Sequence, residues 1–205
     1  MQLLYQTHSP YARKVLVMAH ELFIAERLEI IHHETSPTLR NEIVFAANPL
    51  GKVPVLICDD GLILFDSLVI CEYLDGLHCG PQLIPASGRE RFLALRLQAI
   101  AQGIVDAGIA VRWEIDRRPP QLRWTTMAVG QSEKLLASYD FVEREVDLDG
   151  PLHIGKIALA TALSWIDFRN LPSFKENRPR LTSWYEAFAE RASMRATDYH
   201  GDTHD

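Results

Sequence analysis

Short apolar runs alternate with helical patterns over the first 80 residues of the chain. The runs have the length of buried strands, and they cover residues 2–5, 28–31, 53–58 and 62–65. Asp59-Asp60-Gly61 predicts a hairpin turn between the last two. Apolar side chains recur at helical spacing over 10–23, 41–47 and 67–77. The predicted order of strand, helix, strand, helix, strand, strand, helix is typical of a mixed sheet with helices packed on it.

The second half of the chain shows only helical patterns. They cover residues 90–118, 125–146, 154–168 and 180–191, and Pro119-Pro120 ends the first of them. Glycine and proline are frequent before this region, which is typical of a linker. We therefore predict a first domain at 1–78, a linker at 79–88 and an all-helical domain at 89–205.

Composition and charge exclude several classes of protein. The 205 residues carry a net charge of -6, which argues against nucleic acid as a partner. No apolar run has the roughly 18–20 residues of a membrane helix, and the first residues lack the pattern of a signal peptide. The three cysteines, Cys58, Cys71 and Cys79, show no zinc-ligand spacing. We expect no membrane partner and a cytoplasmic location.

Ser9-Pro10 marks the predicted start of the first helix. Serine is a preferred N-cap and proline a preferred first helical residue, so simple capping explains the pair. The same geometry also suits chemistry, because a helix N-terminus favours an anion and a capping hydroxyl still has a proton to donate. No thiol stands at this position, so the anion has to come from a ligand. Thr7 offers the same hydroxyl as an alternative, and Tyr5 is a third choice.

Two further pairs stand where predicted strands meet loops. Proline cannot donate to a strand ladder, so Val53-Pro54 predicts a strand start, an edge or a bulge. Asp66-Ser67 follows a strand and precedes a helical pattern, which predicts helix capping. Both pairs have structural explanations that need no ligand.

Taken together, three motifs resemble those of the cytosolic glutathione S-transferase family. They are Ser9-Pro10-Tyr11-Ala12-Arg13-Lys14-Val15, Asn48 to Leu56 (NPLGKVPVL) and Phe65-Asp66-Ser67. The resemblance implies an α/β thioredoxin-like N-terminal domain followed by an all-α helical-bundle C-terminal domain. The first motif resembles the bacterial branch of the family that has serine where other branches have tyrosine or cysteine.

The resemblance also implies a co-substrate, which is glutathione, and the residues that bind it. Ser9 would activate the thiol, Val53 before a cis-Pro54 would bind the cysteinyl backbone, and Ser67 and Asp66 would bind the γ-glutamyl carboxylate and ammonium. Lys52 either binds the glycyl carboxylate or is a solvated turn lysine. Tyr11 and Trp113 are the candidates for contact with a small hydrophobic electrophile, which would accept the glutathione thiol. The family further implies a homodimer.

Two other functions remain open at this point. One is a non-catalytic glutathione-binding or interaction protein with the same fold. The other is a glutathione-dependent thiol reductase, which requires a cysteine where Ser9 stands.

Several charged residues receive structural interpretations only. Arg13 and Lys14 are expected to be surface or interface charges. We expect no metal site, since His32-His33 and the pair His200 and His204 lack partners at ligand spacing. The family usually begins its central C-terminal helix with a Ser/Thr-x-x-Asp capping box, which here is His153-Ile154-Gly155-Lys156. We therefore expect Asp147 or Asp149 to cap this helix, or its start to be weak.

Overall fold

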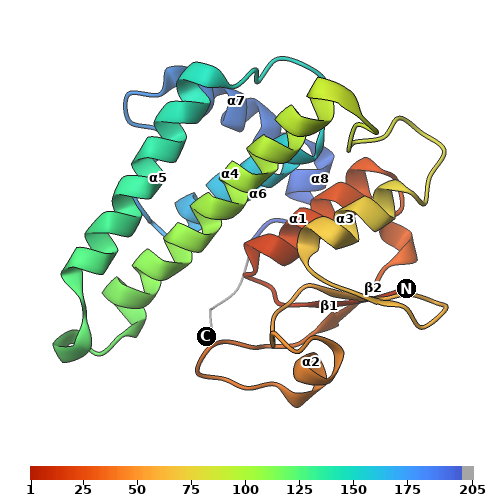
Figure 1. The fold of residues 1–205 in the computed structure, drawn as a ribbon, viewed down its shortest axis with the longest axis horizontal. Coiled ribbons are helices and arrows are strands. Elements are labelled where there is room, and N and C mark those ends of the chain that lie inside the picture. Colours follow the sequence, from red (N-terminus) through yellow and green to blue (C-terminus); the bar gives the residue numbers. More distant parts are fainter. Residues whose placement is uncertain (200–205) are drawn as a thin grey trace. The chain divides into compact units, whose positions relative to one another are not determined.

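The computed structural model describes residues 1–199, which form two compact units (Figure 1). The first unit is Met1–Ile84 together with the segment that begins at Ala192, and the second is Pro85–Arg191. His200 and His204, which entered the metal argument above, lie outside the described residues.

The first unit contains a four-stranded mixed sheet, as the sequence predicts. Its strands are β1 (Gln2–Tyr5), β2 (Glu29–His32), β3 (Val55–Ile57) and β4 (Ile63–Leu64), and their order is β2-β1-β3-β4. β1 pairs in parallel with β2 and antiparallel with β3, and β3 pairs antiparallel with β4. This is the thioredoxin-like arrangement.

Helices cover both faces of this sheet. Figure 1 shows α1 (Pro10–Glu21) and α3 (Ser67–Asp75) on one face and α2 (Glu42–Ala47) on the other. Val44 of α2 packs in a cluster with Leu4, Val53 and Val55. Alternate strand positions point to opposite faces, so Leu3 and Leu56 face α1 and α3, and both are fully buried.

Of the two expectations for Arg13 and Lys14, surface or interface charges, the first is wrong. Both side chains are buried, with 2% and 3% of their surface exposed. Arg13 donates a hydrogen bond to the carbonyl of Met194, because the C-terminal segment with its short helix α8 (Ala192–Arg195) returns to α1. A contact over 181 residues leaves no trace in local periodicity.

Two cysteines are buried in the core of the first unit. Cys58 and Cys71 are 4% and 0% exposed, and burial raises the pKa of the Cys71 thiol to about 12. Both therefore pack as small apolar side chains.

The second unit is helical throughout its regular structure. It consists of α4 (Gly88–Arg112), a π-helical turn (Trp113–Arg117), a short 3-10 helix (Pro120–Leu122), α5 (Thr125–Glu145), α6 (Ile154–Phe168) and α7 (Pro179–Ala189). α6 is its central helix and buries every residue from Ile154 to Ile166. α4 approaches α6 closely at Gly155, where an added Cβ would lie 2.5 Å from the carbonyl oxygen of Ala94. The predicted bundle of helices is thereby confirmed.

One described helix is long and apolar enough to span a membrane by length and composition alone. It runs over Gly88–Arg117, its most apolar window has a mean hydropathy of 1.3, and 44% of that window is buried inside the protein. The core helix of a soluble bundle meets the same criterion, so this feature is weak support for a membrane segment.

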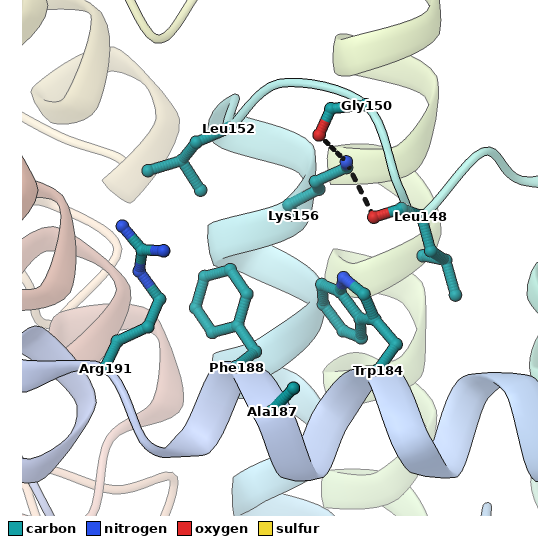
Figure 2. Close-up of a pocket in the computed structure, with 8 residues that line it drawn as sticks. All are labelled: Leu148, Gly150, Leu152, Lys156, Trp184, Ala187, Phe188 and Arg191. Carbon is teal, nitrogen blue, oxygen red and sulfur yellow. Dashed lines mark hydrogen bonds between the residues drawn. The ribbon is translucent and has the colours of Figure 1, made fainter.

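His153 caps α6, and the expectation that Asp147 or Asp149 does so is wrong. The Nδ1 atom of His153 accepts a hydrogen bond from the backbone N–H of Gly155 at 3.1 Å. Asp147 instead accepts from the N–H groups of Asp149 and Gly150 in the preceding loop. The ammonium of Lys156, in the first turn of α6, donates to the carbonyls of Leu148 and Gly150 and ties that loop to the helix (Figure 2).

The cap makes stability depend on pH. Nδ1 accepts a hydrogen bond only when it is unprotonated, and burial together with the nearby Lys156 charge lowers the pKa of His153 from 6.5 to about 4. Between these values the unfolded chain binds a proton that the folded chain does not. The contribution of His153 is therefore complete above about pH 6.5 and is lost as the pH falls toward 4.

We expect His153→Ser to remove this dependence, because serine caps a helix without titrating in this range. In urea unfolding at pH 7.5 and pH 4.5, the parent should lose about 1–2 kcal/mol more stability than the variant; this range is discounted because the imidazole is partly exposed to solvent. Equal losses in the two proteins would show that the pKa of His153 is the same in the folded and the unfolded chain, which contradicts a neutral His153 cap on α6.

Candidate functional site

Strand pairing brings three loop segments of the first unit to one edge of the sheet. Leu4 of β1 pairs with Val55 of β3, and Leu56 of β3 pairs with Leu64 of β4. Because both pairings are antiparallel, the end of β1, the start of β3 and the end of β4 lie side by side. The segments 6–9, 52–54 and 65–67 therefore meet at this edge, and α1 and α3 both begin there.

Ser9 is the N-cap of α1, as predicted. Its backbone is extended, and its Oγ accepts a hydrogen bond from the N–H of Ala12 at 3.2 Å. Pro10 is the first helical residue. Ser9 is 9% exposed, and its hydroxyl stands at the helix start, where the positive end of the helix dipole favours an anion.

The two alternative hydroxyls have different environments. The Tyr5 hydroxyl donates its proton to the carbonyl of Thr7 at 3.0 Å, and burial raises the pKa of Tyr5. Tyr5 is therefore a poor donor to a ligand. Thr7 is half-buried two residues before the helix cap.

The Val53–Pro54 peptide bond is cis, as the family resemblance implies. Val53 is 7% exposed and lies two residues before the first residue of β3 that pairs with β1. The Phe65–Asp66 peptide bond, on the neighbouring segment, is also cis.

Asp66 and Ser67 begin α3. Oδ1 of Asp66 accepts hydrogen bonds from the N–H groups of Leu68 at 3.1 Å and Val69 at 3.5 Å, so capping is its structural role, and the residue is otherwise exposed. Ser67 is 1% exposed, and within the described part of the chain its Oγ has no hydrogen-bond partner. A buried hydroxyl without a partner costs about 1–3 kcal/mol, so Ser67 is suited to a polar ligand at the start of α3.

Asn48 organises the loop before Pro54, a role that the sequence analysis did not identify. It is 2% exposed. Its amide Nδ2 donates to the carbonyl of Lys52 at 2.9 Å, and its Oδ1 accepts from the N–H of Leu50 at 3.0 Å. The Asn-Pro-Leu-Gly sequence was the available signal, since asparagine side chains often bond to the backbone two residues on.

The other three predicted site residues, Lys52, Tyr11 and Trp113, are exposed or half-buried. Lys52 is exposed beside Val53, and Tyr11 is half-buried in the first turn of α1. Trp113 belongs to the second unit, where it is half-buried at the start of the π-helical turn. Among residues 1–199, no group of three or more His, Cys, Asp or Glu side chains is placed to hold a metal ion.

A pocket of about 230 Å³ in the second unit contains none of the predicted site residues (Figure 2). The rings of Trp184 and Phe188, 5.1 Å apart, project into it from α7, and Lys156 lies opposite them on α6. Lys156 has a structural role in this pocket, because its ammonium donates hydrogen bonds to the carbonyls of Leu148 and Gly150.

Comparisons with known proteins agree with this fold. The family model "Glutathione S-transferase, N-terminal domain" matches residues 8–77. The uncharacterized GST-like protein YibF of Escherichia coli K12 is 32% identical over 97% of this chain and 98% of its own length.

Two crystal structures with glutathione bound are similar over nearly their whole length. A glutathione transferase family member from Pseudomonas fluorescens Pf-5 has a TM-score of 0.94 and 37% identity, covering 98% of this chain and 99% of that chain. A glutathione S-transferase from Methylobacillus flagellatus has a TM-score of 0.82 and 32% identity, covering 97% of this chain and 99% of that chain.

Proposed function

The chain belongs to the glutathione S-transferase family, and we propose that it binds glutathione at this sheet edge and activates the thiol for conjugation to a small hydrophobic electrophile. The observation that carries the proposal is the meeting of two capped helix starts, at Ser9 and at Asp66-Ser67, on either side of the Val53–Pro54 segment. Glutathione has complementary parts: a thiol, a peptide backbone, and a γ-glutamyl group with a carboxylate and an ammonium.

Each part of glutathione has a proposed partner. The γ-glutamyl carboxylate takes the start of α3 and the buried Ser67 hydroxyl, and the ammonium takes Asp66. The cysteinyl backbone pairs with the main chain of Val53 in the manner of a short antiparallel strand, beside Pro54. Lys52 is the candidate partner of the glycyl carboxylate. Tyr11 and Trp113 are the proposed contacts of the electrophile.

The start of α1 is sufficient to activate the thiol. A thiol with a pKa near 8.5 is mostly protonated at neutral pH, and lowering the pKa by about 2 units requires roughly 2.7 kcal/mol. A helix N-terminus contributes about 0.3–2 kcal/mol to a nearby anion, and a hydrogen bond to a charged group contributes about 1.5–3 kcal/mol. Together these cover the requirement without a general base. Ser9 thus takes the role that defines the serine-type branch of the family.

The cysteines bear on the cellular location and on the thiol reductase alternative. Three cysteines are free, and none stands at position 9. Free thiols are typical of a reducing compartment, so we propose a cytoplasmic location. The thiol reductase function lacks its nucleophile, and a disulfide-reduction assay with glutathione should give no turnover above background.

The γ-glutamyl site is tested by Ser67→Ala and Asp66→Asn. Asparagine keeps the helix cap and removes the charge, so the second variant isolates the contact with the ammonium. We expect Ser67→Ala to weaken glutathione binding by about 1–3 kcal/mol, since a hydrogen bond to a charged group is lost, and Asp66→Asn to weaken it comparably. Titration calorimetry measures both affinities. Unchanged affinity in the two variants would place the γ-glutamyl group elsewhere.

The thiol-activating role is tested by Ser9→Ala. We expect the pKa of the bound thiol to rise and glutathione affinity to remain, because the other proposed contacts are at Val53, Asp66 and Ser67. Turnover at neutral pH should fall roughly tenfold to a hundredfold. The ultraviolet absorbance of the thiolate, titrated against pH with glutathione bound, measures the pKa directly.

Thr7→Ala is the matched control for Ser9→Ala. A parental titration in Ser9→Ala together with a raised pKa in Thr7→Ala would move the role to Thr7. A parent protein that binds glutathione without any thiolate signal near neutral pH would instead identify a non-catalytic glutathione-binding protein, which is the alternative function for this fold.

We also propose that the protein is a homodimer. Large apolar side chains are exposed on α4 and α5, among them Phe92 at 71% and Val129 at 51%. Such exposed apolar side chains are available to pack against a second copy of the chain. Sedimentation at micromolar concentration should give about twice 23.3 kDa. A single species of monomer mass would contradict this proposal.

A further inference from the structure

Arg13 is a fully buried cation in the first half of α1, four residues after Ser9. Its side chain is 2% exposed, and three of its partners belong to the segment that follows Ala192. Nη2 of Arg13 donates to the carbonyl of Met194 at 3.0 Å, and Nε donates to Oγ1 of Thr197 at 3.3 Å. The carboxylate of Asp198 lies 3.7 Å from Nη2.

The segment Ser193–Tyr199 runs along α1 from the end of the helix towards its start. Oγ of Ser193 donates to the carboxylate of Glu21, the last residue of α1, at 2.5 Å. Thr197 and Asp198 reach Arg13, which lies in the second turn of the helix. The segment has only one regular turn of its own, α8, so it depends on α1 for its conformation.

Tyr199 extends this line of contacts to the residue beside Ser9. The guanidinium carbon of Arg13 lies 4.3 Å from the centre of the Tyr199 ring, which is a close cation–π contact. The Tyr199 ring is in turn 6.4 Å from the ring of His8, at an angle of 54°. His8 is 9% exposed and directly precedes Ser9 in the chain.

A buried guanidinium is costly unless hydrogen-bonded and paired, so Arg13 and the segment stabilise each other. The arrangement also places an aromatic contact, between Tyr199 and His8, directly before the helix cap. Burial raises the pKa of Tyr5, in the same region, and the positive charge of Arg13 offsets part of that rise.

We propose that Ser193–Tyr199 is a clasp that closes on α1 around Arg13 and holds His8 and Ser9 in the geometry required by the glutathione thiol. Arg13 and Tyr199 are then positioning residues, which act on the thiol through the start of α1. The inference rests on the proposed function, since it names what positions the thiol-activating hydroxyl.

The experiment compares Tyr199→Leu with Tyr199→Phe in the full chain. Leucine removes the aromatic contacts with Arg13 and His8, whereas phenylalanine retains the ring and serves as the conservative rescue. Two readouts are used. The first is hydrogen exchange, without glutathione, of the backbone amides at residues 8–13 other than Pro10. The second is the pKa of the bound thiol from thiolate absorbance.

In Tyr199→Leu, we expect exchange at the start of α1 to accelerate roughly tenfold or more, with the sheet amides unchanged. The bound thiol's pKa should rise by about 0.5–1 unit, and the affinity for glutathione should stay within about twofold of the parent. In Tyr199→Phe, the exchange rates at the start of α1 and the pKa of the bound thiol should both be close to those of the parent.

Three results in Tyr199→Leu would overturn the clasp. The first is exchange and a thiol pKa equal to those of the parent. The second is faster exchange throughout the first unit, which would indicate a general loss of stability, and the third is faster exchange at the start of α1 with an unchanged thiol pKa. Failure of the proposed function gives a different result. The parent itself would then show no thiolate titration, while exchange at residues 8–13 would still report on whether the clasp orders the helix start.

Discussion

The antiparallel pairing of β3 with both β1 and β4 is the constraint on which the candidate site depends. It turns three segments that are far apart in the chain toward the same edge of the sheet. A parallel pairing at either position would send one of these segments to the opposite edge. Because α1 and α3 begin directly after two of them, the same pairing also brings two helix starts together.

Helix termini and hydroxyl groups, rather than a cluster of basic residues, make this edge suitable for an anionic ligand. The capping of α1 by Ser9 and of α3 by Asp66 leaves backbone N–H groups and the Ser67 hydroxyl at the sheet edge. Such groups act locally, so a chain with a net charge of -6 can still bind a ligand that carries carboxylates. In the proposed function, activation of the thiol depends on how firmly the start of α1 is held, and the proposed clasp around the buried Arg13 holds it.

Local signals in the sequence predicted the elements that form the site. Strand runs, helical spacing and the Ser9-Pro10 and Asp66-Ser67 pairs each depend on a few neighbouring residues, and the structure has these helix starts where they were predicted. The cis Val53–Pro54 bond followed only from the family resemblance, because local sequence favours the trans form.

The features that the sequence did not predict depend on distant contacts or on unusual chemistry. Burial of Arg13 requires the return of a segment about 180 residues away, and no periodic pattern records such a contact. Capping of α6 by His153 was missed because histidine is not among the preferred N-caps and caps only when neutral. Asn48 holds its loop through side-chain bonds that composition alone does not distinguish from those of an ordinary turn.

The central claim is that the sheet edge binds glutathione and deprotonates its thiol, and proton release on binding tests it most directly. Calorimetric titration of the unmodified protein at pH 7.5, in buffers of different ionisation enthalpy, measures the number of protons released. If the thiol pKa falls from about 8.5 to about 6.5, roughly 0.8 proton should be released per glutathione bound. S-methylglutathione, which has no thiol proton, should bind with no such release. Glutathione binding without buffer dependence, or no binding at all, would contradict the account.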